Sequence, residues 1–187
     1  LDSFDTDPNY LGQLIESSLA TKQFAETIPW LRRRAMISRT SAEMESTIAQ
    51  GTIVFRRLEQ PLAFLDALRA DVADGSGAIR ATGLGAACLL SELLELGGDS
   101  QAADQMLTGF EAGLSASPDA TSAVEVLGVQ RIRLWSMRRE WAKAAEAARK
   151  LVEIPGGRQS AHLRRLVELY MRDGQPEQAL AWTAQWK

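Results

Sequence analysis

The chain has 187 residues, of which 45% are hydrophobic and 24% are charged, and its formal net charge is −3. This composition is that of an ordinary globular chain, and the negative balance argues against nucleic-acid binding, which depends on an excess of Lys and Arg. No stretch reaches the roughly 18 consecutive apolar residues of a membrane-spanning helix, and the single cysteine, Cys88, excludes an internal disulfide.

From the N-terminus onward, helix-length apolar stretches come in pairs. In the first pair, Leu11, Leu14, Ile15 and Leu19 follow helical spacing. The pairs define five units, which span residues 8–38, 41–74, 78–115, 119–154 and 158–187. Each unit is predicted to be two antiparallel helices joined by a short polar turn.

The five turns recur at a regular interval. They read Lys22-Gln23-Phe24, Glu59-Gln60-Pro61, Gly98-Asp99-Ser100, Arg139-Glu140-Trp141 and Gly174-Gln175-Pro176. Three residues after each turn stand Thr27, Phe64, Ala103, Ala144 and Ala179, at intervals of 37, 39, 41 and 35 residues. A period of roughly 34–47 residues without a strand signal is typical of helix-pair arrays. The sequence therefore predicts an all-α fold, an α-α superhelix (solenoid) of about five antiparallel helical hairpins, in which each hairpin completes the core of its neighbour.

The last unit also carries a recognisable motif. It contains Leu163, Leu166, Val167, Tyr170, the turn Gly174-Gln175-Pro176, and Ala179. This order of a large apolar residue, an apolar pair, an aromatic residue and an alanine after the turn resembles a degenerate tetratricopeptide repeat. The fourth unit keeps Trp135 and Ala144 but has Arg131 where that family prefers leucine, the second has Phe55 and Phe64, and the first has Ser18 at the aromatic position.

The resemblance implies a binding surface. In tetratricopeptide repeats the first helix of each pair lines the inner, concave face, and its outward residues contact the partner. In this sequence those positions include Glu16, Ile53, Arg56, Arg57, Cys88, Glu92, Glu95, Val129, Arg133, Arg164, Glu168, Met171 and Arg172. We take Arg56, Arg57, Arg133, Arg164, Glu168, Met171 and Arg172 as the candidate partner-binding residues. Because arginine binds carboxylates with two parallel hydrogen bonds, the expected ligand is an acidic segment or the C-terminal carboxylate of another chain.

No catalytic, cofactor or metal site is predicted. The only histidine, His162, stands near an expected helix start, where we interpret it as a surface or helix-end residue. Cys88 lies between Ala87 and Leu89 and is interpreted as a small buried apolar residue. No phosphate-binding glycine motif occurs. The chain is therefore predicted not to be an enzyme.

One short run is strongly basic. Arg32, Arg33 and Arg34 follow Trp30 and Leu31. Since aromatic platforms and an overall positive balance are missing, this run is interpreted as a solvated helix face rather than a nucleic-acid contact.

The charge differs between the two parts of the chain. Residues 1–118 hold 9 Lys and Arg against 16 Asp and Glu, a balance of −7, whereas residues 119–187 hold 12 against 8, a balance of +4. This asymmetry would steer charged partners or favour contact between copies, although ordinary solvated helix faces would give the same counts.

The two ends lack the polar capping elements that close a solenoid. The chain starts at Leu1 without a methionine and stops at Lys187 within an amphipathic stretch, so we expect a piece of a longer protein; the alternative is a natural end at Lys187. Trp182 and Trp186 share one helix face. They would stack on Tyr170 or on a further repeat, or form an exposed patch that drives homo-oligomerisation.

These features favour a non-catalytic protein–protein interaction scaffold that binds a protein or peptide on the inner face of the solenoid. The competing interpretation is a structural segment of a coat-like or multidomain protein that self-associates through its ends, and a third is an accessory helical domain of a multidomain enzyme or regulator. The lack of disulfides fits a reducing compartment and favours the cytoplasm.

Overall fold

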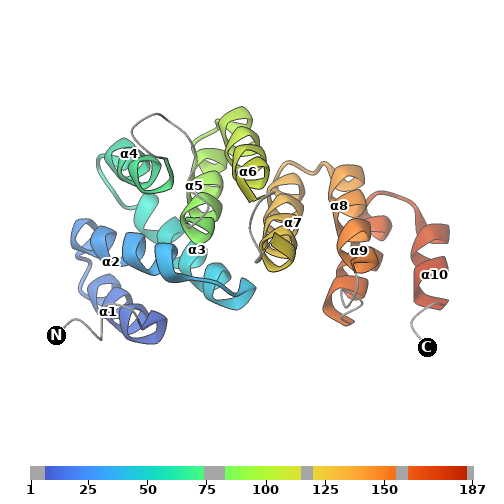
Figure 1. Ribbon diagram of the computed structural model, residues 1–187, viewed down its shortest axis with the longest axis horizontal. Helices are drawn as coiled ribbons and strands as arrows, with labels where there is room; N and C mark the ends of the chain where they lie inside the picture. The colour runs from blue at the N-terminus through green and yellow to red at the C-terminus, as the bar shows by residue number, and fades with distance from the viewer. Residues whose placement is uncertain (1–6, 74–82, 115–119, 155–159, 185–187) are drawn as a thin grey trace. The chain divides into compact units, whose positions relative to one another are not determined.

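A computed structural model describes residues 7–73, 83–114, 120–154 and 160–184, without the side chains of residues 120 and 121. Within these ranges the chain forms ten α-helices and no strand, which confirms the predicted all-α class. The helices are α1 (Pro8–Ala20), α2 (Phe24–Ile37), α3 (Ser41–Phe55), α4 (Pro61–Val72), α5 (Leu84–Leu96), α6 (Ser100–Leu114), α7 (Ala120–Met137), α8 (Trp141–Glu153), α9 (Ser160–Arg172) and α10 (Pro176–Ala184) (Figure 1). The chain divides into two compact units, Leu1–Ala123 and Val124–Lys187.

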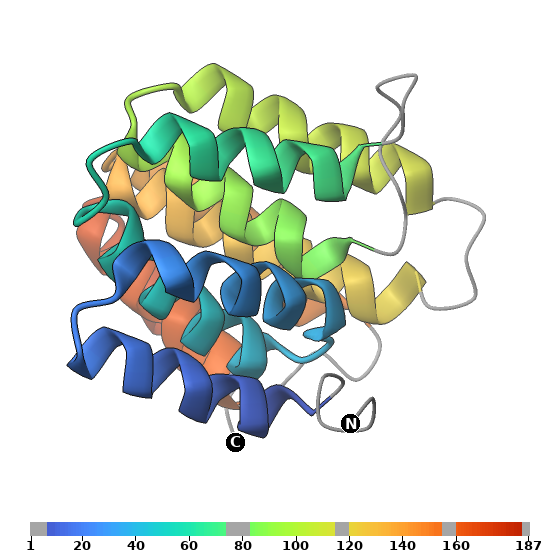
Figure 2. The ribbon, with the colours of Figure 1, turned by 90° about the vertical axis from the view of Figure 1, so that its left-hand side faces the viewer.

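Helix α5 forms the centre of the first unit. Every residue from Leu84 to Leu94 is buried, because α5 packs on α2, α3, α4 and α6. A helix that is apolar on all sides is stable only when other elements enclose it. Figure 2 looks onto α1, α2 and α4, which lie side by side, with α2 packed on both of the others and α5 behind them.

The contact between α2 and α5 depends on a glycine. A Cβ atom built on Gly85 would lie 2.3 Å from the carbonyl oxygen of Ala35 and 3.2 Å from the Cβ of Ser38. No side chain fits at that distance, so the two helices cross with backbone against backbone.

Four of the five connections inside the predicted units have the same backbone conformation. In each, three residues separate the helices, and the second of the three has a positive φ: Lys22 (61°), Gly98 (87°), Arg139 (61°) and Gly174 (74°). The N–H of the next residue donates to the carbonyl five residues earlier, at 2.8–2.9 Å: Gln23 to Ser18, Asp99 to Leu94, Glu140 to Trp135 and Gln175 to Tyr170. A second bond runs from the positive-φ residue to the carbonyl three residues earlier. This pair of bonds is the Schellman motif that ends helices.

In each of these turns, one residue at the start of the second helix is buried. It stands four positions after the last turn residue, which is Gln23, Asp99, Glu140 or Gln175. Thr27, Ala103, Ala144 and Ala179 are at most 2% exposed, and the backbone N–H of each donates to the carbonyl of the last turn residue. Alanine and threonine are small enough to let the two helices of a pair approach closely.

The connection within residues 41–74 is different. Five residues, 56–60, separate α3 from α4, and none of them has a positive φ. Helix α4 packs on α5 and α2, whereas α3 packs on α1, α2 and α5. A two-pronged ion pair holds α4 on α2, with Arg32 Nε and Nη2 each 2.7 Å from an oxygen of Asp71. The expected close hairpin of α3 and α4 is therefore replaced by contacts of both helices with α2 and α5.

The basic run in α2 is not a solvated face, and that interpretation was wrong. Arg32 pairs with Asp71, and only Arg33 is exposed. Arg34 is 7% exposed and donates from Nη1 to Gln50 Oε1 (2.5 Å) and Ser46 Oγ (3.2 Å) of α3. Its guanidinium lies against Gly12 of α1. Burial lowers the pKa of Arg34, and the charges of Glu16 and Glu43 partly offset this effect. Arg34 therefore joins three helices.

The second unit has a core of alanines facing leucines. Helix α8 buries Ala144, Ala145, Ala147, Ala148, Leu151 and Val152. They form one cluster with Leu163, Leu166, Leu169 and Tyr170 of α9 and with Ala179 of α10. Trp135, Trp141 and Trp182 are half-buried against this cluster. The core therefore runs from α8 through α9 to α10.

Candidate partner-binding surfaces

One face of α9 carries four of the seven candidate partner-binding residues. Arg164, Glu168, Met171 and Arg172 are all exposed and follow the spacing i, i+4, i+7, i+8. The opposite face supplies the buried leucines, so the helix is held firmly while these four side chains face outward. Met171 is 58% exposed and places an apolar side chain beside Arg172.

Helix α8 orients one of these side chains. The guanidinium carbon of Arg172 lies 5.2 Å from the ring centroid of Trp141, the first residue of α8. Such stacking leaves the hydrogen-bonding edge of an arginine open to a ligand while it limits the freedom of the side chain.

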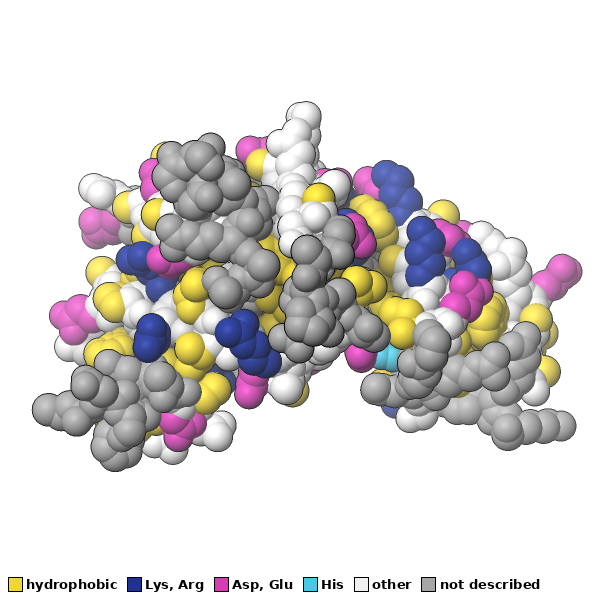
Figure 3. Space-filling model, viewed as in Figure 1, with side chains coloured by type: hydrophobic (Ala, Val, Ile, Leu, Met, Phe, Trp, Pro, Cys, Tyr) yellow, Lys and Arg dark blue, Asp and Glu magenta, His cyan; other side chains and the backbone are white. Residues whose placement is uncertain are grey.

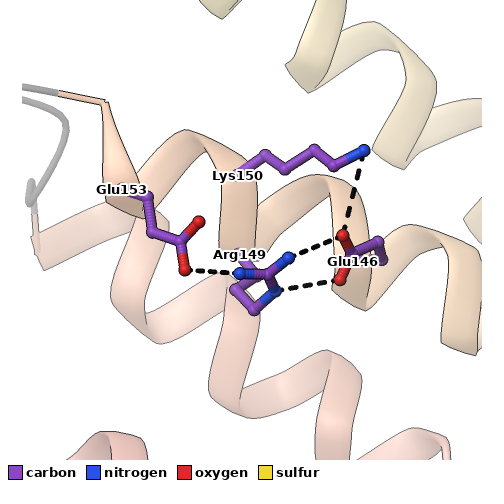
Figure 4. Close-up of polar contacts among 4 residues, drawn as sticks. All are labelled: Glu146, Arg149, Lys150 and Glu153. Atoms are coloured by element: carbon purple, nitrogen blue, oxygen red, sulfur yellow. Dashed lines mark hydrogen bonds and ion pairs between the residues drawn. The ribbon is translucent and has the colours of Figure 1, made fainter.

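Most of the other basic side chains with described contacts already have acidic partners. Arg149 of α8 bonds to Glu146 and Glu153, and Lys150 lies 3.8 Å from Glu146 (Figure 4). The hydrogen bonds that Arg149 donates to Glu146 and Glu153 raise the pKa of Arg149, and the hydrogen bond with Arg149 lowers the pKa of Glu146. Figure 3 shows dark blue and magenta side chains intermixed over α8. The surface of α8 is therefore locally neutralised.

The arginines of the α9 face differ from those of α8. Across the part of the chain that the structure describes, Arg164 and Arg172 have no carboxylate partner. Their positive charge is thus available to an incoming anion. This distinction between paired and unpaired arginines could not be read from the sequence, because it depends on which helix faces meet.

Two further candidate residues lie in the first unit. Arg56 is the C-cap of α3 and Arg57 follows it, and both are exposed. Neither forms an ion pair with any described residue. Ile53, one turn earlier, is 48% exposed. They form a second basic and apolar patch, in a different compact unit from the α9 face.

The seventh candidate residue, Arg133, lies in the middle of α7 and is half-buried, as is Val129 one turn before it. Arg133 is therefore less open to a ligand than the exposed residues of the α9 face.

Two of the three expected binding positions on α5, Cys88 and Glu92, are wrong, whereas Glu95 is half-buried. Cys88 is 1% exposed and Glu92 is 2% exposed, because four helices enclose α5. Burial, together with the charge of Glu92, raises the pKa of the Cys88 thiol to about 12. Cys88 is therefore a buried residue, as the interpretation from its neighbours held, and it does not line a surface.

His162 lies in the first turn of α9 and is half-buried. Its Nε2 is 3.0 Å from Glu125 Oε1 of α7. This contact links two helices of the second unit. His162 therefore lies at a helix end, one of the two alternatives interpreted from the sequence, and it is more enclosed than a surface residue.

The end of the second unit exposes an apolar residue that is not among the candidate partner-binding residues. Leu180 of α10 is 70% exposed, whereas Trp182 is half-buried against the core. Trp186, the other proposed contact residue, lies outside the described residues. Leu180 directly follows the buried Ala179 in the sequence. This position is the signal that could have identified Leu180 as exposed.

The described residues offer neither a metal-binding cluster nor a membrane-spanning helix. In the described ranges, no three His, Cys, Asp or Glu side chains gather in a way that could hold a metal ion. None of the described helices is long and apolar enough to cross a membrane. Comparison with protein-family models, with curated proteins and with solved structures finds no match to this chain.

Proposed function

We propose that this chain is a tetratricopeptide-like solenoid that acts as a non-catalytic scaffold and binds an acidic peptide segment on the outward face of α9. The support for a repeat is the Schellman motif, which recurs at four of the five predicted turns with a small buried residue at a fixed distance after it. The five-residue connection between α3 and α4 makes the predicted repeat at residues 41–74 an irregular member of the array.

The observation that carries the binding proposal is the unpaired charge on α9. Arg164 and Arg172 stand two helical turns apart on one exposed face, with Met171 beside Arg172. Two arginines whose backbone positions lie about 12 Å apart along the helix axis (roughly 1.5 Å per residue) can engage two carboxylates of one extended peptide. Exposed methionine and arginine are also enriched where proteins meet. The ligand would therefore combine at least two acidic residues with an apolar one.

Peptide binding to charge variants tests this proposal. The probe is a fluorescein-labelled 12-residue peptide with six glutamates and three leucines, and fluorescence anisotropy measures its dissociation constant. Arg164→Gln with Arg172→Gln should weaken binding about tenfold, since each exposed charged contact contributes up to roughly 1 kcal/mol. A peptide with lysine in place of glutamate should not bind.

The matched control variant removes two positive charges from α8 instead of from α9. Arg149→Gln with Lys150→Gln leaves the net charge equal to that of the α9 variant, so it should leave the affinity unchanged. Equal loss of affinity in both variants would mean that only net charge matters, and it would refute a binding face on α9.

A further inference from the structure

Helices α8 and α10 occupy equivalent places in the second unit. Each follows the same Schellman turn, and they begin 35 residues apart, at Trp141 and Pro176. Each buries an alanine at its fourth position, Ala144 and Ala179. The two helices can therefore be compared residue by residue.

Helix α8 is covered on two sides. Leu151 packs on α7 at Gly128, where a Cβ would lie 2.6 Å from the leucine side chain. The following helix, α9, packs on α8 as well, and its leucines share one cluster with Ala144, Ala145 and Ala148. As a result Ala145 is only 2% exposed.

Among the described helices of the second unit, α9 covers one side of α10. Helix α10 packs on α9 through Ala179, its one buried residue among those described. Leu180, the equivalent of Ala145, is 70% exposed, and Thr183, the equivalent of Ala148, is exposed too. The positions that α9 covers on α8 are thus open on α10, although they adjoin the same core.

We propose that the side of α10 formed by Leu180 and Thr183 docks the first helix of a helical hairpin of the α9–α10 type. The internal contact of α8 with α9 defines the chemistry of that partner. It is an amphipathic helix with apolar residues spaced like Leu163, Leu166 and Leu169, because such a row covers the equivalent side of α8. The core that runs from α8 to α10 then continues into the partner. This site is separate from the arginine face of α9.

An extended chain tests the proposal directly. A second copy of residues 153–187 is fused after Lys187, so that the appended helices follow at the 35-residue spacing that separates α8 from α10. Leu180→Cys then reports the exposure of the site through its rate of reaction with a maleimide, and Cys88 stays silent because it is buried. Relative to the unextended chain, we expect the extension to slow labelling at position 180 at least tenfold.

Ala181→Cys is the matched control. Ala181 is the equivalent of Glu146, which stays exposed on α8 although α9 is in place. Labelling at position 181 should therefore be equally fast with and without the extension. Replacing the appended copies of Leu163, Leu166 and Leu169 by serine should restore fast labelling at position 180.

Three outcomes would overturn the proposal. Position 180 could label equally fast in both chains, or circular dichroism could show that the appended residues do not become helical. The third is slow labelling at position 180 in the unextended chain, together with a dimer. Light scattering would detect this dimer, and Leu180→Asp would dissociate it. That result would assign the site to a second copy of the chain and support the self-assembling scaffold.

Discussion

At the scale of single residues, close backbone contact places the strictest demand on side-chain size. Gly85 has no room for a methyl group, since the carbonyl of Ala35 occupies that space. Gly97, near the other end of α5, would meet only ordinary contacts at 3.4 Å. The two glycines therefore respond differently to the same substitution.

Gly85→Ala should destabilise the protein by about 2 kcal/mol. Alanine favours helix by up to ~1 kcal/mol over glycine, but the forced separation of α2 and α5 costs roughly 1–3 kcal/mol, and at 2.3 Å the steric cost prevails. Chemical denaturation measures the change. Gly97→Ala is the control and should be neutral or slightly stabilising; a stable Gly85→Ala variant would mean that the helices separate freely.

Burial of polar residues is also decided at this scale. Arg34 continues the buried positions Thr27 and Leu31 of α2 at helical spacing, so the sequence did contain a signal that separates it from Arg32 and Arg33. This spacing is a weak signal, because arginine is usually exposed. The partners of Arg34, Gln50 and Ser46, could not be inferred, since they lie on another helix.

At the scale of helices and turns, the main-chain conformation repeats while the residues vary. The positive-φ position is glycine in two turns, lysine in one and arginine in another. A side chain in this conformation costs roughly 1–2 kcal/mol in a left-handed backbone, so the lysine and arginine turns are strained relative to the glycine turns.

Replacing Arg139 by glycine should therefore stabilise the protein by about 0.5–1 kcal/mol. The gain is smaller than the strain because glycine loses more entropy on folding. Gly174→Arg, at the equivalent position 35 residues later, is the reciprocal variant and should destabilise by a similar amount. Urea denaturation followed by circular dichroism compares the two, and a destabilised Arg139→Gly would show that the arginine side chain contributes contacts that outweigh its backbone cost.

Much of the helix order could be predicted from the sequence, because turn residues and apolar spacing are local signals. All ten helices fall inside the five predicted stretches. The α3–α4 connection could not be predicted. Its residues Glu59-Gln60-Pro61 resemble the other turns, yet the residues that end α3 come earlier, at 56–58. The position of α4 depends on Arg32 and Asp71, which are 39 residues apart. The solenoid arrangement itself stays a prediction.

At the scale of the whole molecule, the chain consists of two compact units of unequal length. The first encloses α5, which is buried from Leu84 to Leu94, and the large side chains Phe64 and Phe110. The second relies on a row of alanines against leucines. Because the buried fraction of surface rises with size, the shorter unit has less to stabilise it.

The two units should unfold at different urea concentrations. Trp135, Trp141, Trp182 and Trp186 belong to the second unit, whereas Cys88 belongs to the first. In a Trp30→Phe variant, which removes the remaining tryptophan, fluorescence should change at lower urea than the concentration at which Cys88 starts to react with a thiol reagent. Coincident transitions would indicate a single cooperative unit.

The shared Schellman turn also determines which substitutions this chain tolerates in its turns during evolution. Its bonds come from main-chain N–H and carbonyl groups alone, so almost any exchange of side chains leaves the bend intact. Proline is the exception at the two donor positions, because it has no N–H to give. Ancestral or distant versions of these turns would then share an absence of proline there rather than any common residue.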